Sequence, residues 1–277
     1  MSIDTADRAA ATPRVEVRPV SFPRVLRSEW IKLWSLRSTY WTVLATLAAM
    51  VLIAVMLGVA SIVEEGAAGP DGQMAIGMGY SFAQVAVAVL GVLTITGEYT
   101  TGMIRSTLAA VPSRLPALAA KAVLVAAVGF VVGMAGVALS YLASYPLLGA
   151  DGAASLSDPQ VHRIFWGSGL YLAGVGVLGL GVGAIVRHTA GAVTLILGVV
   201  LLLPSLWQLL MLTSDWFTTS FAYLPSTAGE RIASPQVSNA VAEGPQALSP
   251  WGGFTVFMIY IMVTFVVAAV LLRRKDA

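Results

Sequence analysis

Six long apolar runs dominate the pattern of hydrophobic and polar positions along the chain. None of them contains Asp, Glu, Lys, Arg or His, and each is at least 22 residues long. A bilayer core about 30 Å thick needs roughly 20 apolar residues, and a helix satisfies its backbone hydrogen bonds internally there. The pattern therefore predicts an all-α polytopic membrane protein, with transmembrane helices at residues 41–63, 74–97, 122–145, 164–186, 191–213 and 251–272 within a membrane domain of residues 39–272.

A segment with helical periodicity precedes the first run. Apolar residues, including Trp30 and Trp34, recur at three- and four-residue spacing within residues 22–38, and basic and hydroxyl residues lie between them. This pattern predicts an amphipathic helix on the membrane surface, because tryptophan favours the interface. Residues 1–21, which lack such a period, are expected to form a mobile cytoplasmic tail. A lipid anchor and a docking surface for a partner both fit the helix, and they are compatible with each other.

Two loops carry further helical signals. Between the second and third runs, Gly102 and Pro112 bracket a piece of two to three turns in which Ile104, Leu108 and Val111 share a face. It fits a short helix offered to another protein, and equally a capped loop whose charges mark the interface. The loop at 214–250 opens with an aromatic stretch that predicts a short interfacial helix.

Basic residues sort by loop and so set the orientation. Of the 16 Lys and Arg residues, 14 lie before the first run, between the second and third, between the fourth and fifth, or after the sixth. The other loops hold most of the acidic residues. Because basic loops stay on the cytoplasmic side, both termini, including the tail at 273–277, are predicted in the cytoplasm and the chain in the cell membrane. The net charge of +2 then needs no nucleic acid to explain it.

Composition and motifs argue against an enzyme. Charged residues make up 11% of the chain against roughly 25% in soluble domains, and there is no cysteine. No GxxxxGK[ST] phosphate loop is present, and the GxGxxG match at Gly174–Gly179 lies within an apolar run, where it favours close helix packing. No catalytic, cofactor or metal site is predicted. An ion-coupled carrier is disfavoured, because no run contains an ionisable residue.

Polar residues inside the second and fifth runs are candidates for a translocation path. Tyr80 and Gln84 lie in the second run, and Trp207 and Gln208 in the fifth. Such a lining suits an amphipathic or apolar passenger better than an ion. For each of these residues taken singly, hydrogen bonding between helices is the favoured explanation.

Two stretches resemble the ABC-2 type ABC transporter permeases of actinobacteria. They are Arg27–Ser38, before the first run, and Gly97–Leu108, which closes the second. The resemblance implies a type V exporter-like architecture: an interfacial helix, six spans, a cytoplasmic coupling helix and a re-entrant or interfacial element before the sixth span.

The same resemblance implies partners and site residues. Such permeases work in pairs, as two copies or paralogues, on two separate ATP-binding subunits that bind ATP and Mg²⁺. Coupling to the ATPase would involve Glu98, Ile104, Arg105, Leu108 and Arg114. The expected function is export of a drug, antibiotic, peptide or lipid; the alternative from another class is a scaffold or sensor that recruits cytosolic partners without transport.

Overall fold

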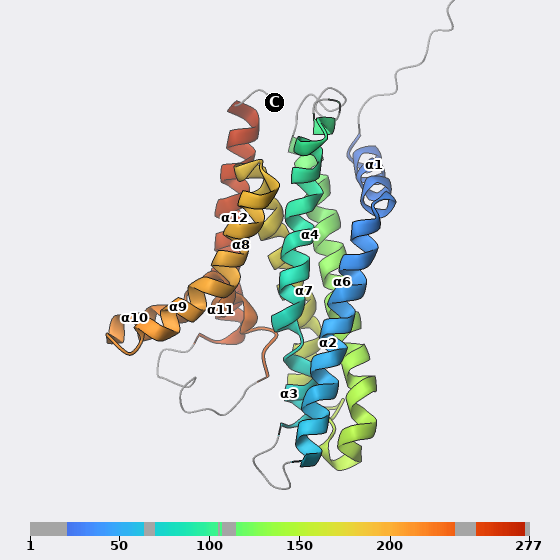
Figure 1. Ribbon diagram of the computed structural model, residues 1–277, viewed down its shortest axis with the longest axis vertical. Coiled ribbons are helices and arrows are strands. Elements are labelled where there is room, and N and C mark those ends of the chain that lie inside the picture. The colour runs from blue at the N-terminus through green and yellow to red at the C-terminus, as the bar shows by residue number, and fades with distance from the viewer. Residues whose placement is uncertain (1–20, 64–69, 105, 107–114, 236–247, 275–277) are drawn as a thin grey trace, which may run out of the picture.

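The computed structural model describes residues 21–63, 70–104, 106, 115–235 and 248–274, and every regular element in them is a helix. Residues 1–20 of the predicted tail at 1–21, and the end of the chain at 275–277, lie outside these residues. The helices are α1 (Phe22–Ser35), α2 (Arg37–Val63), α3 (Gly72–Gly77), α4 (Tyr80–Thr100), α6 (Leu115–Gly152), α7 (Pro159–Val186), α8 (Thr189–Leu197), the π-helical η1 (Gly198–Leu202), α9 (Leu203–Leu210), α10 (Asp215–Phe221), α11 (Pro225–Glu230) and α12 (Pro250–Arg274) (Figure 1).

Six helices are long and apolar enough to cross a membrane, which confirms that prediction from the sequence. They correspond to α2, α3 with α4, α6, α7, α8 to α9, and α12. Several of these helices extend beyond the ends of the predicted apolar runs. The reason is that the hydrogen-bonded helix is longer than its most hydrophobic part. The charged residues Glu98 and Lys121 are thereby included in α4 and α6, respectively.

Helix α7 forms the centre of the bundle. It packs against α4, α6, α8 and α12. In its most apolar stretch 78% of the residues are buried, against 11% in the most apolar stretch of the fifth span. Glycines permit this packing, because their backbones approach closely: a Cβ on Gly91 of α4 would lie 2.0 Å from the carbonyl oxygen of Gly176, and one on Gly133 of α6 would lie 2.7 Å from that of Ser168. The prediction that the GxGxxG match serves helix packing is confirmed.

The fifth span bends part-way along its length. Pro204 has no amide hydrogen to donate, and immediately before it the chain forms η1, in which the Leu203 amide donates to the Gly198 carbonyl. Beyond this π turn, α9 and α10 lean away from the bundle and bury no residue (Figure 1). Helix α10 lies where the aromatic stretch predicts an interfacial helix.

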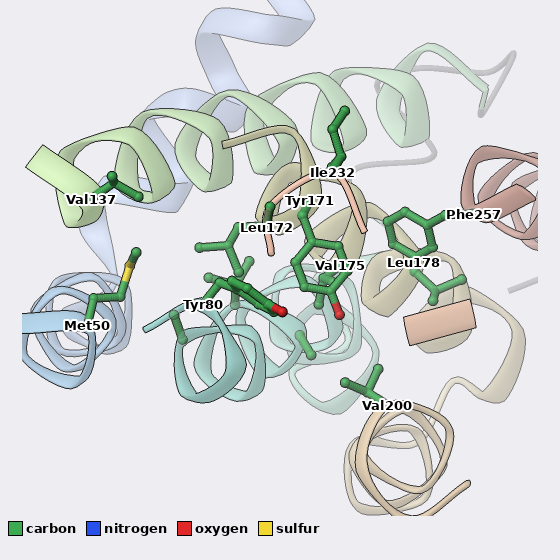
Figure 2. Close-up of a cluster of buried hydrophobic side chains, with 14 of the residues drawn as sticks. Met50, Tyr80, Val137, Tyr171, Leu172, Val175, Leu178, Val200, Ile232 and Phe257 are labelled. Atoms are coloured by element: carbon green, nitrogen blue, oxygen red, sulfur yellow. The ribbon is translucent and has the colours of Figure 1, made fainter. Parts of the chain in front are cut away.

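The largest core cluster lies where α11 and the turn after it meet the long helices. Figure 2 shows Tyr80, Tyr171 and Phe257 side by side within it, and the ring centroids are 5.5 Å apart for both Tyr80–Tyr171 and Tyr171–Phe257. Ile232, from the turn after α11, is also buried there. A segment of the last loop thus completes the core of the membrane domain.

Candidate functional site: a buried ion network joining α1, α4 and α6

Helix α1 presents a narrow buried face to the bundle. Pro23 occupies its first turn, where a missing amide hydrogen costs nothing, and Val25, Glu29 and Leu33 recur at a spacing of four and are buried. Trp30 and Ile31 are exposed on the other side. One position of the buried face is therefore a carboxylate.

Four charged side chains from three helices meet at this face. Lys121 Nζ of α6 lies 2.5 Å from Glu29 Oε2 and 2.8 Å from Glu98 Oε1 of α4. Lys32 Nζ of α1 lies 2.6 Å from Glu29 Oε1 and 2.9 Å from Glu98 Oε1. Lys121 also donates to the Thr94 carbonyl at 3.4 Å. The two acids and two lysines alternate around a closed ring, which we call the ion network.

The network is buried, and this decides its energetics. Glu29, Glu98 and Lys121 are each no more than 5% exposed. Taking a charge out of water costs several kcal/mol, so such a group is tolerated only when opposite charges and hydrogen bonds compensate it. Burial lowers the pKa of Lys32, but the hydrogen bonds and charges of Glu29 and Glu98 outweigh this and hold its pKa above the ordinary 10.5. The network fixes α1 against α4 and α6.

A cation–π contact extends this connected end of the bundle toward α12. The guanidinium of Arg187, which follows α7, lies 5.5 Å from the centre of the Tyr99 ring and donates to the Leu271 carbonyl at 3.1 Å. Arg187 has a left-handed backbone with φ 59°, which ends α7 and turns the chain into α8. The ends of α4, α7 and α12 are joined here to the helices held by the network.

The residues expected to couple to an ATPase divide into two groups. Glu98 is in the ion network, and Ile104 is 7% exposed, so neither offers a free surface. Met103 beside it is 44% exposed, and Ser106 is exposed as well. Arg105, Leu108 and Arg114 lie outside the described residues. Among the described residues after Tyr99, the exposed part of this segment is therefore Thr100–Met103 together with Ser106.

The residues expected along a translocation path belong to two separate sets of contacts. Tyr80 and Gln84 are buried in the core, where Gln84 Oε1 accepts a hydrogen bond from the Tyr171 hydroxyl. Trp207 packs its ring on Trp216 and Phe217 of α10 and donates to Ser220 Oγ at 2.9 Å, and Gln208 is exposed.

The sequence pattern does not point to three members of the network, Glu29, Lys32 and Lys121. Lys121 adjoins the third apolar run and resembles an ordinary loop charge, and Lys32 is one of the basic residues between the apolar positions of 22–38. The available signal was Glu29, which lies four residues from both Val25 and Leu33 on one helical face. A carboxylate in that register requires a buried cation, although periodicity does not say which one.

A second polar group lies farther toward the other end of the bundle, around α11 and beside the start of α12 (Figure 1). Arg163 of α7 donates to the carbonyls of Arg231, Ile232 and Ser234 at 3.0 to 3.1 Å, and so holds the turn that follows α11. Glu230, the last residue of α11, is partly buried. Within the described ranges, no three His, Asp or Glu side chains gather as metal ligands.

Comparisons with known proteins add no relative to this description. No protein-family model matches the chain, and the search of curated proteins finds no match.

Proposed function

We propose that this chain is the membrane-spanning permease of an ATP-binding cassette exporter, driven by a separate ATPase subunit and forming the path of an amphipathic or apolar substrate. The observation that carries the proposal is the ion network. It ties the surface helix α1 to the beginning of α6 and to the end of α4, from which the 98–114 segment emerges.

The network supports coupling because it makes a force at the surface act on the spans. A push on the exposed segment around Met103 reaches α4 directly and reaches α1 and α6 through Glu98. An isolated surface ion pair is worth about 0–1 kcal/mol and would yield, whereas breaking a buried pair costs about 3–5 kcal/mol. The three helices would then move as one body.

An external energy source is needed because the sequence contains no phosphate loop. The proposed complex has two ATP-binding subunits with ATP and Mg²⁺, and a second permease that is a copy or a paralogue. The polar residues of the second and fifth spans remain the proposed lining of the path, with Tyr80 and Gln84 on one side and Trp207 and Gln208 on the other.

The test is affinity purification of the full chain, in mild detergent, from cells that encode it. We expect an ATPase subunit in stoichiometric amount. Met103→Asp places a charge on the exposed segment and should lower the recovered ATPase at least tenfold while the chain elutes as a folded species. Met103 is chosen over Ile104 because Ile104 is buried, so that its substitution would test folding instead.

The matched control is Leu156→Asp, which makes the same kind of change at a residue 51% exposed in the loop between α6 and α7. This variant should retain the ATPase. Purification of the chain without any ATPase would contradict the proposal and favour the scaffold, and equal recovery with both variants would contradict the role of the Met103 segment.

A further inference from the structure

Helix α11 and the turn after it pack so closely against α7 and α12 that the contact positions on α7 and α12 have no room for a side chain. A Cβ on Gly253 of α12 would lie 2.4 Å from the Ala228 carbonyl oxygen, and one on Gly167 of α7 would lie 2.0 Å from that of Ile232. Residues Pro225–Gly229 are all buried. The carboxyl group at the end of this helix is therefore held in a fixed environment.

The adjacent Arg231 is the cation whose charge acts on that carboxyl group. In the residues that the structure describes, the Glu230 side chain makes no hydrogen bond or ion pair. It also lies at the carboxyl end of α11, where the helix dipole disfavours negative charge. Burial and the helix end both favour the neutral form, and only the adjacent Arg231 opposes them.

The groups around Glu230 are mostly engaged with one another. The charge of Glu230 acts on Tyr80 of α4 and Tyr171 of α7, and the hydroxyl of Tyr171 is donated to Gln84. Arg163 is bound to three carbonyls of the turn after α11. From α12, Tyr260 donates its hydroxyl to the Tyr223 carbonyl, and η1 contributes only glycine and aliphatic residues, Gly198–Leu202.

We propose that Glu230 is a proton-binding site of the membrane domain, and that binding of the proton stabilises α11 in its packed position between α7 and α12. We call this packed position the seat of α11, and the protein with α11 in it the seated state. The proposal rests on the insertion of α11 and on a carboxyl group that makes no hydrogen bond or ion pair with the described residues. It needs neither a partner subunit nor an assignment of the two sides of the membrane.

The direction of the effect follows from proton linkage. Burial raises the pKa of Glu230 from its ordinary 4.5 to about 7. The seated state binds the proton more tightly than a released α11, so it is most stable below about pH 4.5 and loses stability as the pH rises toward 7. Each unit changes the ratio of seated to released protein by up to about tenfold.

The first experiment observes the proton directly. In the unmodified chain in lipid nanodiscs, infrared spectra recorded from pH 5 to 9 should show a protonated-carboxyl band that titrates near pH 7 and is absent from Glu230→Gln. Asp215→Asn, which removes an exposed carboxyl of α10, should leave the band unchanged. A spectrum that Glu230→Gln does not alter would overturn the proposal.

The second experiment measures the seating of α11, using the absence of cysteine from the chain. Ser226→Cys places a thiol in α11 at a buried hydroxyl that lacks a hydrogen-bond partner in the described part of the chain, so no bond is lost. Its maleimide labelling rate is divided by that of Thr219→Cys on the exposed face of α10, which corrects for thiol ionisation.

We expect this ratio to rise at least tenfold between pH 5 and 7.5, and to stay within twofold when Glu230→Gln is added. The same rise in both backgrounds would show that another group titrates. No rise in the native background would show that the proton does not control the seat of α11. Either result would overturn the proposed link.

Discussion

The two ends of the bundle treat buried charge in opposite ways. At the α1 end, Glu29, Lys32, Glu98 and Lys121 neutralise one another, and three helices are fixed together. Around α11, Glu230 makes no ion pair with the described residues, and burial raises its pKa to about 7. A closed ring of opposite charges resists change, whereas a lone carboxyl group changes charge near neutral pH. We infer that the first end transmits force and the second responds to conditions.

The largest effect is expected from removing one lysine of the ion network. Lys121→Met leaves Glu29 and Glu98 with only Lys32 between them and should destabilise the chain by about 3–5 kcal/mol. Thermal unfolding in detergent would measure the loss, and adding Glu29→Gln should restore part of it. Arg27→Gln, on the exposed side of α1, should change stability by less than about 0.5 kcal/mol.

A cost equal to that of Arg27→Gln would show that the network does not fix the helices. The proposed distinction between the two ends would then be lost, because both would carry charges without structural consequence.

A smaller loss is expected where α11 meets α12. Gly253→Ala brings a methyl group against the Ala228 carbonyl oxygen and should cost about 1–3 kcal/mol through overpacking. The matched control is Gly97→Ala in α4, which meets nothing within 4 Å and should be neutral or stabilising by up to about 1 kcal/mol. Thermal unfolding compares them, and an equal effect of both would show that α11 is not held by this contact.

The smallest effect is expected in the α9–α10 arm. Ser220→Ala removes the acceptor of the Trp207 indole hydrogen and should cost about 0.5–1.5 kcal/mol. Because neither helix buries a residue, the change should raise hydrogen exchange of α9 and α10 without lowering the melting temperature of the bundle. A lower melting temperature would mean that the arm is part of the cooperative unit.

The sequence predicts the membrane helices well because lipid imposes a simple condition on them. A run such as 122–145 has to be long, apolar and helical whatever it packs against, so its length and composition suffice. The bend at Pro204 follows from the missing amide hydrogen in the same local way. Features set by one residue or one run could therefore be found before the structure was known.

The candidate sites depend on packing between distant segments, which a single sequence does not encode locally. Glu98 and Lys121 look like ordinary loop charges until α1 is placed across them with Glu29. Helix α11 has six residues and no apolar period, so nothing indicated that it carries Glu230 into the bundle. Each apolar run lacks ionisable residues, but the inserted helix α11 brings the Glu230 carboxyl group close to the long helices.

The neutrality of the ion network also determines how it responds to an electric field. Moving one elementary charge across a membrane is worth about 2.3 kcal/mol per 100 mV. The two carboxylates and two ammonium groups sum to zero, so a shift of all four as one unit gains or loses almost nothing from the transmembrane voltage. The ion network itself therefore adds almost no electrical cost to a movement of these helices.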